Sequence, residues 1–562
     1  MKNKMRRLGT LLIVFIMFPA LMQAKNPKWL KNAKKAVVEV IAYNEEGKEI
    51  SRSNGFFIND DGTGLTGLDV LQDANSAVTV DAAGIKRPIV ILLGADNTYD
   101  VVRFRVEPDK KLKALTLSPQ VKAAETDKVH LLPYKKNLKE LSVSGVERIS
   151  DTHSYYTVDA PWDSTMLDSP LLNDAGIVIG MVQKGKTGDP QTYAIDAGYV
   201  NDIEITALNR DDNVYRDLKI KVSLPQDEDQ ALAYIMMKRG VRSMAECRPL
   251  HEQFLEQFPD SPDGMFAMGT FLIQETDSTE YDAGLEFIEK AFAAAQDKER
   301  FHCDYANIIL NHLLQGLKAP AAWTYEKALS EIDAALKIDG KPVYHEIRGN
   351  ILYAMERYPE AYNSYVKVNA SDIASSDTYL RAYYISLHME DSINLSIALL
   401  DSVIIKFGTP MPQRASQVLM ERAILKEEAG RNREAVVDYY TYESLLGTYS
   451  MSAEFYYRRA QVEIKARMFE QALNDMEKAR SLAPDDSSLV LEHASLMLRV
   501  GDTDGALPLL EELVISYPDV GDVQRLLGVC YMRRDEMEKA RRHLTLAKEL
   551  GDEPAATLLE QF

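Results

Sequence analysis

A 34-residue period in the C-terminal part of the chain restricts its fold more than any other sequence feature. Two series of small residues and one of prolines recur at this spacing: Ala472, Ala506 and Ala540; Ala460, Ala494 and Gly528; Pro484 and Pro518. Small residues let two antiparallel helices approach closely, and proline ends the second helix of a unit. Each unit leaves an apolar face that only a neighbour can cover, so we expect the units to stack into a solenoid.

The residues within one period resemble the tetratricopeptide repeat (TPR). The three units over about 453–552 carry the pattern most fully, with Gly528, Tyr531, Ala540, Leu544, Ala547 and Asp552 in the last. Earlier units keep parts of it: Ala423, Ala435 and Tyr439; Gly349, Ala361 and Tyr365; Ala328, Ile332 and Ala335; Ala283 and Phe287. Insertions such as Leu317–Trp323 blur the period there. We expect about eight or nine helix pairs over residues 230–562; the alternative is a helical domain without repeats.

The TPR resemblance implies a concave groove lined by the first helix of each pair. Such grooves hold a peptide or a helix of a partner protein, and proteins of the cell envelope are candidate partners here. Transferring the register of the repeat predicts that seven residues face the groove: Glu346, Asn350, Tyr353, Met420, Tyr457, Gln461 and Ile464.

The N-terminus has the layout of a secretory signal peptide. A basic segment with Lys2, Lys4, Arg6 and Arg7 precedes an apolar run over 11–18, and small residues follow up to Ala24. The apolar run is shorter than the roughly 20 residues of a spanning helix. We therefore expect residues 1–24 to be removed on export; the alternative is an uncleaved anchor. No later stretch is apolar enough to span a membrane.

Charge and cysteine content exclude several classes of function. The chain has 562 residues and a net charge of −20, whereas nucleic-acid binding needs clustered Lys and Arg. Its three cysteines, Cys247, Cys303 and Cys530, are far apart and form no CxxC or Cys/His pair. This spacing predicts neither a disulfide framework nor a zinc site. We expect no cofactor and no metal.

Residues 33–208 differ from the helical part. Short β-branched runs alternate with turn signals; the runs cover 36–43, 55–58, 77–80, 89–93, 101–106, 128–132, 155–158 and 177–182. Many short strands with regular turns predict an all-β barrel or sandwich. Residues 209–229, rich in Asp, Asn and basic residues, are expected to form a linker to the helical part.

Five motifs of this domain, in order, resemble the trypsin-like serine proteases, nearest to the bacterial periplasmic HtrA group. The first consists of the run 54–62 and the run 65–71 that follows it. The others are the runs 100–106, 165–173, 176–182 and 192–195. The resemblance implies a double β-barrel followed by the TPR solenoid. It also implies that the protein belongs to a Gram-negative bacterium and that, after export, it is periplasmic or associated with the outer membrane.

The chain departs from the protease pattern where the catalytic residues belong. Asp69 stands at the histidine position and Leu167 at the nucleophile position, and only Asp100 keeps the family residue. Thr165 and Asp168 replace the glycines beside the nucleophile. Leucine cannot attack a carbonyl, and loss of single triad members costs on the order of 10⁴–10⁶ in turnover. We therefore predict a catalytically dead protease-like domain.

Three functional hypotheses remain open. The leading one is an extracytoplasmic scaffold or adaptor that binds proteins through its repeats. The second is a serine endopeptidase of unusual constellation, with Ser164 or Ser169 as nucleophile, His130 or His153 as base, and repeats that recruit substrate. In the third, the barrel binds an extended peptide at an edge strand without cleaving it.

Overall fold

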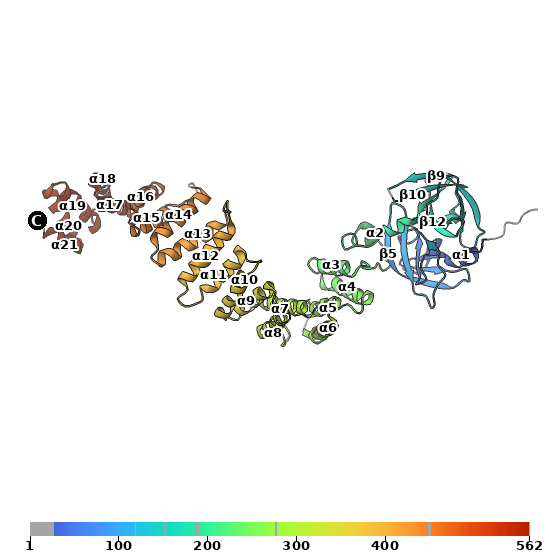
Figure 1. Ribbon diagram of the computed structural model, residues 1–562. Helices are drawn as coiled ribbons and strands as arrows, with labels where there is room; N and C mark the ends of the chain where they lie inside the picture. Colours follow the sequence, from blue (N-terminus) through green and yellow to red (C-terminus); the bar gives the residue numbers. More distant parts are fainter. Residues whose placement is uncertain are drawn as a thin grey trace, which may run out of the picture. The chain divides into compact units, whose positions relative to one another are not determined.

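The computed structural model describes residues 27–118, 120–150, 152–185, 190–275, 278–447 and 451–560, and Figure 1 follows the chain through them. The predicted signal peptide at 1–24 lies outside these residues. The chain forms two compact units, one up to Ala294 and one from Ala295 on. Within the described ranges, no helix is both long and apolar enough to cross a lipid bilayer.

The first unit begins with a closed six-stranded barrel that follows the short helix α1 (Leu30–Ala36). Its strands are β1 (Val37–Tyr43), β2 (Glu49–Phe57), β3 (Thr63–Thr66), β4 (Ser76–Val80), β5 (Lys86–Asp96) and β6 (Val101–Val106). They pair in the order β1-β2-β3-β6-β5-β4, with β4 returning to β1. Buried side chains of β1, β2 and β6, among them Val38, Phe57 and Phe104, fill the barrel.

A second barrel follows in the same unit. Its strands are β7 (Thr116–Leu117), β8 (Lys128–Leu131), β9 (Lys139–Arg148), β10 (Ser154–Pro161), β11 (Pro170–Leu172), β12 (Ile177–Gln183) and β13 (Gln191–Asp196). The order is β11-β8-β9-β10-β13-β12, closed by pairing of β11 with β12, and β7 joins β12 in parallel. The double barrel that the protease resemblance implies is thus confirmed.

The predicted linker 209–229 is folded against the first barrel. Its short helix α2 (Asn213–Arg216) lies beside β5 (Figure 1). The hydroxyl of Tyr215, buried in the barrel core, accepts a hydrogen bond from the Ala95 amide at 3.1 Å. Leu92 forms a parallel bridge with Val222. Tyr215, Ile220 and Val222 belong to the core, Ser223 is fully buried, and Arg210 donates to the carbonyls of Val222 and Ser223. The segment is therefore packed against the barrel.

Two helix pairs complete the first unit. They are α3 (Glu228–Arg239) with α4 (Met244–Gln257), and α5 (Pro262–Glu275) with α6 (Tyr281–Ala294). A Cβ atom at Gly269 would lie 2.6 Å from the carbonyl oxygen of Gly284, so α5 and α6 meet backbone to backbone. Small residues thus bring these paired helices together, as the sequence pattern predicts.

The second unit is all helical and consists of successive antiparallel pairs. In the described residues these are α7 (Lys298–Leu314) with α8 (Tyr325–Ile338), α9 (Pro342–Ala354) with α10 (Tyr358–Asn369), α11 (Ser376–Ser386) with α12 (Ile393–Phe407), α13 (Ala415–Glu428) with α14 (Asn432–Leu446), α15 (Ala453–Lys465) with α16 (Phe469–Leu482), α17 (Ser487–Val500) with α18 (Thr503–Ser516), and α19 (Gly521–Arg533) with α20 (Met537–Glu549), followed by α21 (Glu553–Leu559). The periodic alanines 460, 472, 494, 506 and 540 are fully buried. The predicted all-α solenoid is confirmed.

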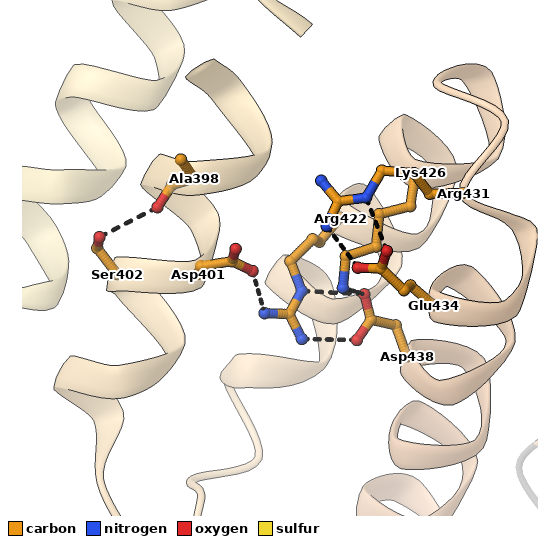
Figure 2. A network of polar contacts seen from close by, with 8 residues as sticks. All are labelled: Ala398, Asp401, Ser402, Arg422, Lys426, Arg431, Glu434 and Asp438. Atoms are coloured by element: carbon orange, nitrogen blue, oxygen red, sulfur yellow. Dashed lines mark hydrogen bonds and ion pairs between the residues drawn. The ribbon is translucent and has the colours of Figure 1, made fainter. Parts of the chain in front are cut away.

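Arginines that are fully or partly buried between helices join several of these pairs. Arg422 on α13 donates to Asp401 on α12 at 2.6 Å and, through two nitrogens, to Asp438 on α14 at 2.6 and 2.9 Å (Figure 2). The ammonium of Lys426 donates to the same Asp438 carboxylate at 2.9 Å. One guanidinium therefore bridges three consecutive helices, and a second cation helps neutralise the buried acid.

The same contact recurs at a fixed spacing. Arg459 on α15 bonds Asp475 on α16, 16 residues later, and Glu443 on α14. Arg348 on α9 bonds Ser364 on α10, again 16 residues later, and Asp333 on α8. In each case the arginine precedes the small residue at which the paired helices meet. The periodic sequence thus specifies a polar contact as well as an apolar one.

Candidate functional site

The loop that carries the predicted nucleophile position is held between the two barrels by Asn54 of β2. The Asn54 amide donates to the carbonyl oxygens of Thr165, at 3.1 Å, and Leu167, at 2.6 Å. Its side-chain oxygen accepts from the backbone N–H of Tyr134 at 2.8 Å. The loop itself is the single 3₁₀ turn η1 (Ser164–Met166), which Asp163 caps by accepting from the Thr165 amide. Leu167 is half-buried directly after this turn.

Asp168, at a predicted glycine position, is fully buried beneath the loop. Its φ of 59° is the left-handed conformation that glycine would adopt at less cost. The Ser53 hydroxyl donates to one of its carboxyl oxygens at 2.5 Å, and the Asp168 amide donates to the Val182 carbonyl at 2.9 Å. A Cβ atom at Gly67 would lie 2.7 Å from both carboxyl oxygens, so the glycine at 67 makes room for this side chain.

Asp69 and Asp100, the other two predicted triad positions, are in direct contact. The backbone N–H of Asp69 donates to a carboxyl oxygen of Asp100 at 2.7 Å, while the Asp69 side chain is exposed. Burial raises the pKa of Asp100, and the nearby Asp69 charge adds to this effect. Burial also raises the pKa of Asp168 well above its ordinary value, and the Asp100 charge raises it further. The predicted triad positions Asp69 and Asp100 and the neighbouring Asp168 thus bring three carboxyl groups into one region.

We expect Asp168→Asn to stabilise the protein at neutral pH. The raised pKa means that the fold favours the neutral acid, so this group's contribution to stability is complete below about pH 4 and is lost as the pH rises through the folded-state pKa. The amide keeps an acceptor for Ser53 and cannot ionise. Calorimetric unfolding from about pH 4 to pH 8 should show a weaker fall in Tm for this variant. Asp159→Asn, on the exposed face of β10, is the matched control and should leave the profile unchanged.

The backbone N–H groups that would form an oxyanion hole are engaged within the loop. In this mechanism the hole uses the N–H groups of the nucleophile and of the residue two before it, here Leu167 and Thr165. The Leu167 amide donates to the Ser164 carbonyl at 3.3 Å. The Thr165 amide donates to the Asp163 carboxylate at 2.9 Å. In this conformation neither donor is directed at a substrate carbonyl.

The alternative serines and histidines are not paired with one another among the described hydrogen bonds. His130 on β8 contacts the Asp174 carboxylate at 2.7 Å, and His153 contacts that of Asp202 at 2.5 Å. Ser169 is fully buried and its hydroxyl has no hydrogen-bond partner in the described structure. Ser164 is exposed on η1. A serine–histidine pair for the alternative hydrolase is therefore not formed in this conformation.

A second candidate site lies in the helical unit, where a cavity of about 230 Å³ opens between α9 and α11. Two of the seven predicted groove residues, Asn350 and Tyr353, line it. Glu346 is on the same helix outside the lining, Met420 is on α13, and Tyr457, Gln461 and Ile464 are on α15. The other lining residues are Tyr365, Arg381, Tyr384, Ile385, Leu387 and His388. Tyr384 and Leu387 lie one 34-residue period after Asn350 and Tyr353, so extending the period to α11 would have found them.

Side-chain contacts fix the walls of this cavity. The Tyr365 hydroxyl donates to the Asn350 side-chain oxygen at 2.6 Å. The His388 ring stacks on Tyr358 with 4.4 Å between centroids, and Tyr353 meets the same imidazole edge-on at 5.8 Å. The walls are thus aromatic and held in place before any ligand binds.

Within the described residues, no group of three or more His, Cys, Asp or Glu side chains is arranged to hold a metal ion. The three cysteines are free.

Comparison with known proteins identifies both parts of the chain. Residues 53–181 match the family described as trypsin-like peptidase domain, and residues 497–561 match the tetratricopeptide repeat. No curated protein matches the chain. Among solved structures, the chain is similar to a serine endoprotease from Yersinia pestis, with 21% identity, a TM-score of 0.27, and coverage of 34% of this chain and 65% of that one. The chain thus carries a trypsin-like peptidase domain followed by tetratricopeptide repeats.

Proposed function

We propose that this protein is an extracytoplasmic adaptor that binds partner proteins through its repeats, and that its protease-like domain is catalytically inactive. The observation that carries the proposal is the preformed cavity between α9 and α11, on the helices that line the groove of a TPR array. Aromatic side chains with fixed positions provide contact area at low entropic cost, which is typical of protein-binding surfaces. The basic signal-like segment at the N-terminus supports an extracytoplasmic location.

The chemistry of the protease-like domain supports inactivity. The predicted nucleophile position holds Leu167, the predicted histidine position holds Asp69, and the nearby Asp168 has no path to act as a nucleophile because it is fully buried. Acyl transfer needs a nucleophile, a base and oxyanion donors at one point. The domain then serves to present the repeats or to bind a second surface.

Site-specific photo-crosslinking tests the adaptor function. A benzophenone amino acid at Tyr353, which lies in the cavity wall, should give discrete crosslinked partners in cells that express the full chain. The same probe at Val437, exposed on the second helix α14, is the control and should give none of these bands. If both positions give the same bands, or neither gives any, the groove is not the working surface.

Fluorophosphonate labelling tests inactivity. We expect no covalent labelling of the purified full chain and no hydrolysis of unfolded casein, because neither Ser164 nor Ser169 is hydrogen-bonded to a histidine ring in the part of the chain that the structure describes. Leu167→Ser should stay inactive as well, since the imidazole is still absent. Labelling that Ser164→Ala or Ser169→Ala abolishes would establish the hydrolase alternative instead.

A further inference from the structure

We propose that the cavity between α9 and α11 recognises a short motif in a partner protein, a large apolar or aromatic side chain followed or preceded by an acidic residue. This inference rests on the proposed function and specifies its ligand. The apolar side chain enters the cavity, and the neighbouring carboxylate is bound by Arg381 at the rim.

The size of the cavity selects one side chain. Its volume of about 230 Å³ is below the roughly 300–1,000 Å³ of sites that enclose drug-sized molecules. The rings of Tyr353 and Tyr384, 41% and 39% exposed, leave wide apolar faces open to the solvent. Covering these faces removes apolar surface from water, which stabilises a complex by roughly 25 cal/mol per Å² before the costs of association.

Hydrogen bonding in the cavity favours an acceptor group on the ligand. The Tyr365 hydroxyl already occupies the Asn350 side-chain oxygen, and in the described structure the Asn350 amide nitrogen donates to no other residue. The contacts of His388 with Tyr358 and Tyr353 hold its ring in the wall. The Asn350 amide group can therefore donate to the ligand, whereas the Asn350 side-chain oxygen already accepts a hydrogen bond from Tyr365.

The charge of Arg381 also favours an acidic ligand, because Arg381 differs in its ion pairing from the arginines of neighbouring first helices. Arg348 and Arg422 each bind a carboxylate of the protein itself. Among the described residues no carboxylate forms an ion pair with exposed Arg381, whose neighbour is the Tyr365 hydroxyl. In a chain with a net charge of −20, a cation without an acidic partner at the rim of an aromatic cavity is complementary to a carboxylate. A guanidinium binds such a group through two parallel hydrogen bonds.

Selection of displayed random linear peptides on the purified full chain tests the motif. We expect enriched peptides to place Phe, Tyr, Trp or Leu next to Asp or Glu. An enriched peptide, made with an amidated C-terminus so that only side-chain carboxylates remain, should bind Arg381→Glu at least about tenfold more weakly in fluorescence anisotropy. The matched control is Arg542→Glu, at an exposed position of α20, and this variant should bind the peptide as tightly as the original protein does.

A double-mutant cycle separates the charge contact from general loss of fold. Replacing the acidic residue of the peptide by its amide should weaken binding to the original protein but not to Arg381→Glu. Enriched peptides without an acid, or an acid whose removal weakens both proteins equally, would overturn the motif. Crosslinking at Tyr353 would still support the adaptor function in that case, so failure of the motif and failure of the function are distinguishable.

Discussion

Replacement of Arg459 by alanine should weaken the α14–α16 part of the array by about 3–5 kcal/mol, the usual loss when one partner of a buried ion pair is removed. Arg459 is fully buried, bonds Asp475 and Glu443, and lies over the Tyr440 ring at 4.0 Å. Its loss leaves two acids without their main cation. Because the chain has several domains, the effect is best measured as the opening free energy of peptides from α14–α16 in hydrogen exchange.

Two further variants show whether the unpaired buried charge causes the loss of stability. Arg431→Ala removes an exposed pair with Glu434 and should cost no more than about 1 kcal/mol. Arg459→Leu combined with Asp475→Leu should recover part of the loss, because an apolar pair needs no desolvation of charge. A single Arg459 variant as stable as Arg431→Ala would show that the network contributes little.

Replacement of Asn54 by alanine should cost roughly 2–3 kcal/mol, because a buried polar group left without a partner costs about 1–3 kcal/mol. Three groups would lose a hydrogen bond, namely the carbonyls of Thr165 and Leu167 and the amide of Tyr134, and of these the Leu167 carbonyl keeps a bond from the Ser53 hydroxyl at 3.3 Å. All three belong to the second barrel, whereas Asn54 belongs to the first. Hydrogen exchange of the 163–169 loop should rise sharply, and the main barrel transition should move to lower temperature.

Asn54→Asp distinguishes the hydrogen bonds from the shape of the side chain. Aspartate keeps the acceptor for Tyr134 but places charge against two carbonyl oxygens, so it should be at least as damaging as alanine. Asn97→Ala, on an exposed loop of the same barrel, should stay within about 0.5 kcal/mol of the original. Equal stability of Asn54→Asp and the original protein would contradict the role assigned to Asn54.

Periodicity made the helical part predictable. Ala460, Ala472, Ala494 and Ala506 sit where paired helices touch, and their spacing is set by the geometry of the repeat, so the sequence alone indicates it. The barrels were predictable for a different reason, the order of five motifs. The connection at 209–229 was not, because its polar residues dominate its composition while the few apolar ones, such as Tyr215 and Val222, determine its packing.

The candidate sites were predictable only where the repeat or the family motif extends to them. Asn350 and Tyr353 follow from the register, but the role of Arg381 does not, because whether an arginine forms an ion pair depends on which acids lie near it in space. Likewise Asp168 could be aligned with a glycine position, yet its burial against Ser53 and Gly67 joins segments more than 100 residues apart. Contacts of that kind leave no local signal in one sequence.

The arginine contacts between helices bear on how the array responds to temperature. In α8–α10 and α12–α16 an arginine lies between the paired helices, whereas in α17–α20 the residues that precede Ala494 and Gly528 are His493 and Leu527, and the contacts between these helices are mainly apolar. The ion pair of Arg525 with Asp552 lies after α20 and not between the helices of a pair. Apolar contacts lose strength on cooling, while the cost of desolvating charges falls on heating. We therefore expect the C-terminal repeats to lose more stability on cooling than the central repeats, and the central repeats to keep their stacking better on heating.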